Sequence, residues 1–113
     1  MTDCIFCKIV SKKIPVEPLA EYEGAILIRD KNPIAPHHVL AIAKEHVSSI
    51  HELDYEFTLL EMLALLCNYA EQNKLNESGY RIVINTGKDA GQTVPHFHAH
   101  LVGGATLKND FGA

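Results

Sequence analysis

The sequence has 113 residues, of which 47% are hydrophobic and 21% charged, and its formal net charge is −4 at pH 7. A chain of this length forms one small domain with a single core, so we expect one domain over residues 1–113. The acidic balance argues against binding to extended nucleic acid, which usually requires a basic surface. The apolar runs are too short to span a membrane, and the N-terminus lacks the apolar core of a signal peptide. We therefore expect a cytoplasmic protein that does not bind membranes.

The pattern of apolar residues and turn signals predicts a short N-terminal helix, five strands and one long helix. In chain order we expect a helix over 4–10, strands over 19–22, 25–28 and 39–43, a helix over 54–75, and strands over 80–84 and 96–102. Strands joined by a loop instead of a helix indicate an antiparallel sheet. The predicted fold class is therefore α+β. The polar tail, 105–113, is expected at the surface.

Apolar residues recur at helical spacing along the predicted long helix, after Asp54 as its N-cap. The expected apolar stripe consists of Leu59, Leu60, Leu63, Leu66, Cys67 and Ala70. Cys67 is accordingly expected in the core. One helix covers only one face of a sheet, so the remaining apolar surface or a sheet edge favours association into a homodimer.

Three histidines alternate in His96-Phe97-His98-Ala99-His100. In a strand they share one face, and the outer two lie roughly 13 Å apart, too far for one atom to contact all three. The segment 91–95 before them is rich in turn residues and carries a hydroxyl and backbone N–H groups. A half-exposed polar strand and a zinc site built on one histidine pair are the alternatives. The loop favours a phosphate held against a nitrogen nucleophile, because a metal site needs no anion-binding turn.

Several separated motifs resemble the histidine triad (HIT) superfamily, and within it the Hint branch of nucleotide phosphoramidases. They occur in family order over about residues 4–104: Cys4-Ile5-Phe6-Cys7-Lys8-Ile9, Ile14-Pro15, Asp30, Asn32-Pro33, Ala35-Pro36-His37-His38-Val39, Lys44-Glu45-His46-Val47, Asn85 and Gly91-Gln92-Thr93-Val94-Pro95-His96-Phe97-His98-Ala99-His100. The resemblance implies a HIT-like fold that pairs into a twofold dimer. It also implies hydrolysis of a nucleoside 5′-monophosphoramidate through a nucleotidyl-histidine.

The resemblance implies a role for each residue of the triad region. His98 would be the nucleophile, and His100 would contact the phosphate oxygens and assist the leaving group. Thr93 would bind non-bridging oxygens, and His38 would support the imidazole network. Asp30 would accept hydrogen bonds from the ribose. The full nucleotide-binding set is Asp30, Asn85, Phe6, Ile9, Ile28, Gly91, Gln92, Thr93, Val94, His98 and His100, in which Phe6, Ile9 and Ile28 line the base pocket and Asn85 bonds near the phosphate ester.

A second set of residues suits zinc. The pair Cys4-x2-Cys7 is a weak signal alone, but with His46 and His96 it forms a Cys2His2 set typical of tetrahedral structural zinc. Relatives with the paired cysteines bind zinc at these four positions, which gives His96 a role separate from the other two triad histidines. His51 is a fallback ligand.

Two other functions remain open: a nucleotide-binding or scaffold protein without catalysis, and a dinucleoside polyphosphate hydrolase. The chain length and the N-terminal block disfavour the second, and the intact triad region disfavours the first. The expected ligand is an AMP- or GMP-type nucleotide. Four positions depart from the family pattern: Thr93 stands where serine is usual, Pro95 removes one N–H group, Ala99 is small where leucine is common, and Lys31 replaces an apolar residue that often contacts the base. The tail also lacks the tryptophan found near the C-terminus of related purine phosphoramidases. Base preference and leaving group are therefore left open.

Overall fold

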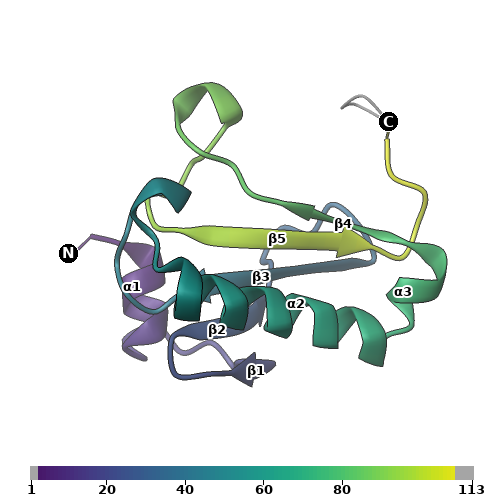
Figure 1. Ribbon diagram of the computed structural model, residues 1–113, viewed down its shortest axis with the longest axis horizontal. Helices are drawn as coiled ribbons and strands as arrows, with labels where there is room; N and C mark the ends of the chain where they lie inside the picture. The colour runs from purple at the N-terminus through teal and green to yellow at the C-terminus, as the bar shows by residue number, and fades with distance from the viewer. Residues whose placement is uncertain (1–2, 109–113) are drawn as a thin grey trace.

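The computed structural model describes residues 3–108 and contains a five-stranded sheet in the order β1-β2-β3-β5-β4 (Figure 1). All neighbouring strands are antiparallel. The strands are β1 (Ala20–Glu21), β2 (Ala25–Arg29), β3 (His37–Ala43), β4 (Tyr80–Val83) and β5 (His98–Gly103). The predicted α+β class with an antiparallel sheet of five strands is confirmed.

A short N-terminal helix, α1 (Ile5–Val10), and a long helix lie beside the sheet (Figure 1). The long helix starts with a π-helical turn (Tyr55–Leu59) and continues as α2 (Leu60–Gln72). Asp54 is its N-cap, as predicted, and its side chain accepts hydrogen bonds from the next N–H groups. The helix ends before the predicted residue 75, because Lys74 adopts the left-handed conformation (φ 59°) and interrupts the hydrogen-bond ladder. The single turn α3 (Leu75–Ser78) follows.

The buried side of α2 differs from the predicted stripe. Met62, Leu65, Leu66 and Ala70 are buried, whereas Leu60 is 61% exposed. The expectation that Cys67 lies in the core is wrong, because its side chain is exposed. Leucines surround much of this helix, so the periodicity alone fits more than one face. Packing on the sheet selects the face that is buried.

The two faces of the sheet carry different layers. Leu27, Val39, Ala41 and Leu101 face α2 and form the larger core with it. The residues that alternate with these in β2 and β3 face the other side of the sheet. There they form a second apolar cluster with Phe6 and Ile9 of α1; its strand members are Ile26, Ile28, Leu40 and Ile42. Because side chains alternate along β5, His98 and His100 lie on this second face, opposite α2.

Element ends differ slightly from the predicted ones. Strand β3 begins at His37, two residues before the expected start, and β5 begins at His98, two residues after it. Short 3-10 turns occupy Ile50–Glu52 and Lys88–Ala90.

The beginning of the tail, 105–108, is largely exposed, and residues 109–113 lie outside the described part of the chain. Within that part, every helix is too short or too polar to cross a membrane.

Candidate active site

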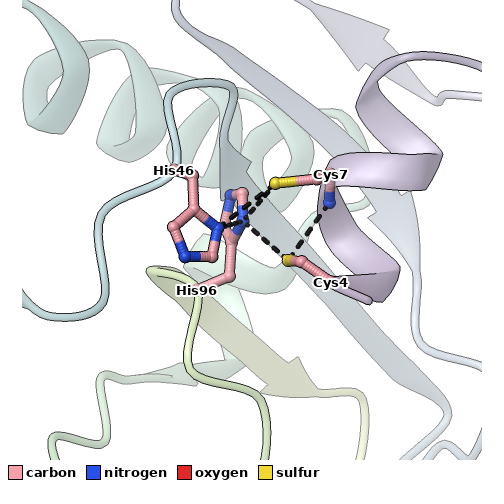
Figure 2. A group of neighbouring side chains, drawn as sticks. All are labelled: Cys4, Cys7, His46 and His96. Atoms are coloured by element: carbon pink, nitrogen blue, oxygen red, sulfur yellow. Dashed lines mark hydrogen bonds between the residues drawn. The ribbon is translucent and has the colours of Figure 1, made fainter. Parts of the chain in front are cut away.

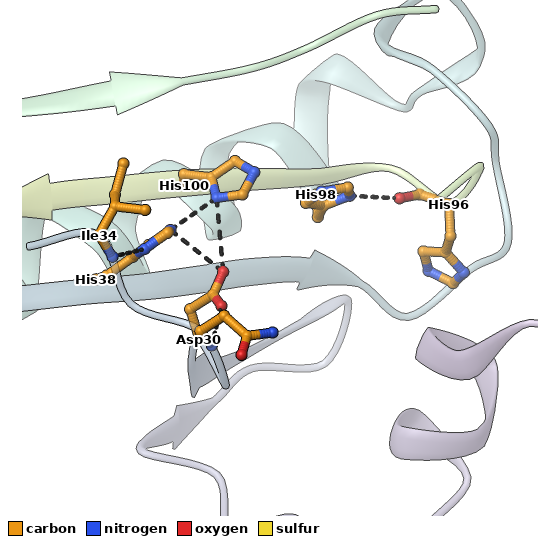
Figure 3. A network of polar contacts seen from close by, with 7 residues as sticks. Asp30, Ile34, His38, His96, His98 and His100 are labelled. Carbon is orange, nitrogen blue, oxygen red and sulfur yellow. Dashed lines mark hydrogen bonds and ion pairs between the residues drawn. The ribbon is translucent and has the colours of Figure 1, made fainter. Parts of the chain in front are cut away.

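Three imidazoles and one carboxylate form a polar cluster on the sheet face opposite α2 (Figure 3). His38 Nε2 lies 2.9 Å from His100 Nδ1 and 3.2 Å from Asp30 Oδ2. His100 Nδ1 lies 3.9 Å from the same carboxylate oxygen. The rings of His98 and His100 are 5.1 Å apart between centroids. Neighbouring strands thus bring together residues that are 62 positions apart in the chain.

A backbone group selects the tautomer of the His38 ring. The N–H of Ile34 donates to His38 Nδ1 over 3.2 Å, so the neutral ring carries its proton on Nε2. That proton faces both Asp30 Oδ2 and His100 Nδ1. When His38 donates to His100, His100 Nδ1 is an acceptor and the ring proton of His100 sits on Nε2.

His98 is fixed in the opposite tautomer. Its Nδ1 lies 2.7 Å from the backbone carbonyl oxygen of His96, which can only accept a hydrogen bond. Nδ1 therefore carries the proton, and Nε2 keeps its lone pair. The Phe6 ring packs edge-on against this imidazole, with centroids 4.9 Å apart. This contact restricts the orientation of the His98 ring. The unprotonated Nε2 is therefore held in one position.

Burial keeps the triad imidazoles neutral. Loss of solvation lowers the pKa of His98. It also lowers the pKa of His100 to about 4, with the neighbouring His98 and His38 adding to the effect and Asp30 opposing it. A neutral imidazole is both a nucleophile and a hydrogen-bond donor near pH 7.

The loop before the triad has fewer free N–H groups than the sequence suggests. Gly91 N–H donates to the carbonyl of Lys88, and Gln92 N–H donates to that of Gly87. The Gln92 side chain links Gly87 N–H to the Ser48 carbonyl, so it holds the loop closed. Within the described chain, the N–H groups of Thr93 and Val94 are left without a partner. The Thr93 side chain is exposed and lines a cavity beside Cys4 and His46.

The residues expected around the base are mostly buried. Phe6, Ile9 and Ile28 are 7%, 7% and 4% exposed and belong to one apolar cluster, against which Val94 packs. Only their outer edges are accessible. Asn85 is half-buried and lies two residues beyond β4.

The four residues predicted to bind zinc converge at the start of α1 (Figure 2). The Sγ atom of Cys4 lies 3.2 Å from His96 Nδ1, and that of Cys7 lies 3.2 Å from His46 Nδ1. The four ligand atoms lie within 4.8 Å of one another. His51 is exposed and stands outside this group.

The hydrogen bonding of His96 fits a metal ligand. Its Nε2 lies 2.6 Å from the carbonyl oxygen of Ala43, so Nε2 carries the proton and Nδ1 presents a lone pair to both thiol sulfurs. Zinc-bound histidines commonly donate their second N–H to a carbonyl in this way. The donor set therefore fits zinc.

A second group, Asp30, His38 and His100, also brings ligand atoms within 4.8 Å. It fits a metal less well, because the Ile34 N–H donates to Nδ1 of His38 and places the ring proton on Nε2, where a metal would bind.

A family model described as the HIT domain matches residues 11–107. The chain belongs to the HIT family. It is 34% identical to the purine nucleoside phosphoramidase of Escherichia coli over 93% of this chain and 90% of that protein. Its fold matches a HIT family hydrolase from Legionella pneumophila with a TM-score of 0.90 at 35% identity, covering 97% of this chain and 100% of the other. The predicted HIT-like fold is therefore confirmed.

A metal-bound relative shares the same fold. The zinc-bound histidine triad family protein from Mycobacterium smegmatis matches with a TM-score of 0.79 at 33% identity, over 97% of this chain and 78% of that one.

The sequence does not reveal the backbone groups that fix these HIT imidazoles. The Ile34 N–H, the His96 carbonyl and the Ala43 carbonyl each set one tautomer, and no side chain marks them. The contact between Asp30 and His38 was also not expected. The turn that holds Asp30 does have a signal: its Oδ1 accepts the Asn32 N–H over 2.8 Å, as in an Asx-turn.

Proposed function

We propose that this HIT protein hydrolyses the P–N bond of nucleoside 5′-monophosphoramidates. The proposal rests chiefly on the 2.7 Å hydrogen bond from His98 Nδ1 to the His96 carbonyl, which leaves Nε2 of a buried, neutral ring as a nucleophile. The phosphoramidase relative from Escherichia coli supports the choice of bond.

In the first step, His98 Nε2 attacks the α-phosphorus and forms a P–N bond while the bond to the leaving amine breaks. The leaving amine takes its proton from water and leaves hydroxide, while the Nε2–H of His100 donates a hydrogen bond to the leaving nitrogen and keeps its proton. In the second step, water attacks the phosphorus and displaces His98 Nε2, and the proton of that water neutralises the hydroxide. The products are the nucleoside monophosphate and the free amine, and both histidines end in their starting tautomers.

Donors around the phosphate would stabilise the charge on its oxygens. We assign this role to the Thr93 hydroxyl and the N–H groups of Thr93 and Val94, on a loop that Gly91 and Gln92 shape. Asn85 would bond near the phosphate ester.

The nucleoside would lie against the same face of the sheet. Asp30 has lone pairs left for the ribose hydroxyls after its contacts with Asn32 and His38. The outer edges of Phe6, Ile9 and Ile28 would contact the base.

The direct test is to incubate the protein with adenosine 5′-phosphoramidate and, separately, with diadenosine polyphosphates, and to measure AMP release. We expect much faster turnover of the phosphoramidate. Preference for the polyphosphates would favour the other hydrolase, and AMP binding without turnover of any substrate would favour a nucleotide-binding protein.

We also propose that Cys4, Cys7, His46 and His96 hold one structural zinc ion. Four protein ligands would leave no open position for a substrate, so the ion would tie α1 to the sheet. Reduced thiols of this kind persist in the cytoplasm, where we place the protein.

A homodimer is the assembly that the exposed surface favours. Strand β4 lies at an edge of the sheet, where unpaired backbone groups can join a second copy. Beside it, Tyr80 contacts the exposed Cys67 of α2 (O–S distance 3.9 Å), and Leu60 is exposed on the same helix. We propose that this surface meets its own copy around a twofold axis.

A further inference from the structure

A second cavity lies on the face of the sheet that the imidazole cluster does not use. Its volume is about 440 Å³, and it opens between the C-terminal half of α2 and the β1–β2 side of the sheet. This is the edge opposite β4 (Figure 1), so the proposed dimer leaves it accessible. Leu19, Leu27 and Leu65 form apolar walls. The volume is in the range of small-molecule sites.

The polar groups that line this cavity favour an anion. Arg29 and His37 contribute cationic or donor groups, and no lining residue, all of them in the described chain, is acidic. A guanidinium pairs with a carboxylate through two parallel hydrogen bonds. Burial raises the pKa of Tyr69, and the nearby Arg29 partly offsets the rise, so the hydroxyl stays protonated beside the cation.

One further donor is available in either tautomer of His37. Its Nδ1 lies 2.6 Å from the Tyr69 hydroxyl oxygen. If the tyrosine donates, the proton of His37 is on Nε2 and free for a ligand. If His37 donates, the tyrosine proton is free instead. The two rings pack edge-on, with centroids 5.6 Å apart, which fixes them at the wall.

Arg29 sets the direction of the ligand. The last turn of α2 contributes Tyr69, Gln72 and Asn73 to the cavity and carries only partial negative charge, whereas Arg29, at the end of β2, carries a full positive charge. An anionic group is therefore favoured beside Arg29. We propose that the cavity binds a small organic carboxylate, with its charge on Arg29 and His37 and its apolar body against the leucines.

The location links this site to the opposite face. Arg29 precedes Asp30 and His37 precedes His38, and consecutive side chains along a strand point to opposite faces. The two segments are joined by the Asp30 N–H, which donates to the His38 carbonyl over 2.9 Å. The side chains that would bind a carboxylate are thus carried by the same two segments that position Asp30 and His38 of the polar cluster.

Backbone amide NMR with benzoate as the probe tests the proposal and locates the binding. We expect saturable shifts at Ala20, Arg29, His37 and Tyr69, and none with the uncharged benzamide at the same concentration. Arg29→Gln should weaken benzoate binding at least about tenfold, since it removes the charged hydrogen-bond partner. Arg29 is exposed, so the fold should be kept, and unchanged amide spectra elsewhere will check this.

The matched control is Arg81→Gln, which removes the chain's other arginine from outside the cavity and should leave binding unchanged. The proposal is overturned if shifts do not saturate, if they appear only around Thr93 and His98, or if benzamide binds equally well. It is also overturned if Arg29→Gln binds benzoate as tightly as the wild type. None of these outcomes depends on hydrolytic activity, so the test is independent of the proposed function.

Discussion

The backbone carbonyl of His96 accepts the Nδ1 proton of His98 over 2.7 Å, while the side chain of His96 lies with Cys4 in the Cys2His2 group. One residue therefore belongs to both sites. Phe6 makes a second connection, because it lies between the two cysteines in the chain and its ring packs on His98. The contacts of Phe6 and His96 therefore connect the N-terminal segment to the imidazole of His98.

Replacing His98 with alanine removes the proposed nucleophile. We expect turnover of adenosine 5′-phosphoramidate to fall by about 10⁴-fold or more, because nucleophile deletions in covalent catalysis cost this much. Binding of AMP should be largely kept. Intact-mass measurement of a quenched wild-type reaction should show a nucleotidyl adduct that the variant lacks.

The control for this change is His51→Ala, an exposed histidine outside both clusters, which should keep wild-type turnover. Near-normal turnover in the His98 variant would disprove the assignment.

Acid should destabilise the protein partly through His100. Burial and the neighbouring imidazoles lower the pKa of His100 from 6.5 to about 4, so the unfolded chain binds its proton more readily than the folded one. Its contribution to stability is present above about pH 6.5 and is lost as the pH falls through 4. Calorimetric melting temperatures between pH 7 and pH 4 should therefore drop less steeply for His100→Asn than for the wild type. Equal slopes would show that His100 is not the group responsible.

Zinc removal should lower stability. Cys7→Ser should purify without zinc and lose about 2 kcal/mol or more of folding free energy, which corresponds to a melting temperature lower by about 10 °C. Elemental analysis of protein purified without added metal measures the zinc. The matched variant His51→Ala should keep one zinc per chain. A wild type that contains no zinc and reacts at once through all its thiols would contradict the site.

Self-association should depend on the exposed side of α2. Leu60→Asp places a charge on the proposed twofold surface, and the side chain is 61% exposed in the single chain, so the fold should be kept. Sedimentation at micromolar concentration should show a dimer for the wild type and a 12.5 kDa monomer for the variant. Ile34→Asp, at a side chain that is 78% exposed on another surface, should remain dimeric. A fully active wild-type monomer would rule the dimer out.

The sequence predicted most of the elements, because short-range physics determines them. Alternation of apolar residues indicated the strands, and Asp54 marked the helix start through its side-chain oxygen. The prediction of the long helix was weaker, because more than one of its faces could pack against the sheet with a similar free energy. The buried face of α2 and its end at Gln72 are examples, since leucines on several sides fit more than one packing.

The sequence by itself also determined which residue types were available for chemistry: alternating histidines after a donor loop, and a Cys2His2 set. Only the tertiary structure decided their tautomers, because the partners of His38, His96 and His98 are backbone groups that any residue supplies. It alone also brought Arg29, His37 and Tyr69 around one cavity. These contacts join segments far apart in the chain, and their distances follow from strand pairing and helix packing, which local sequence patterns do not encode.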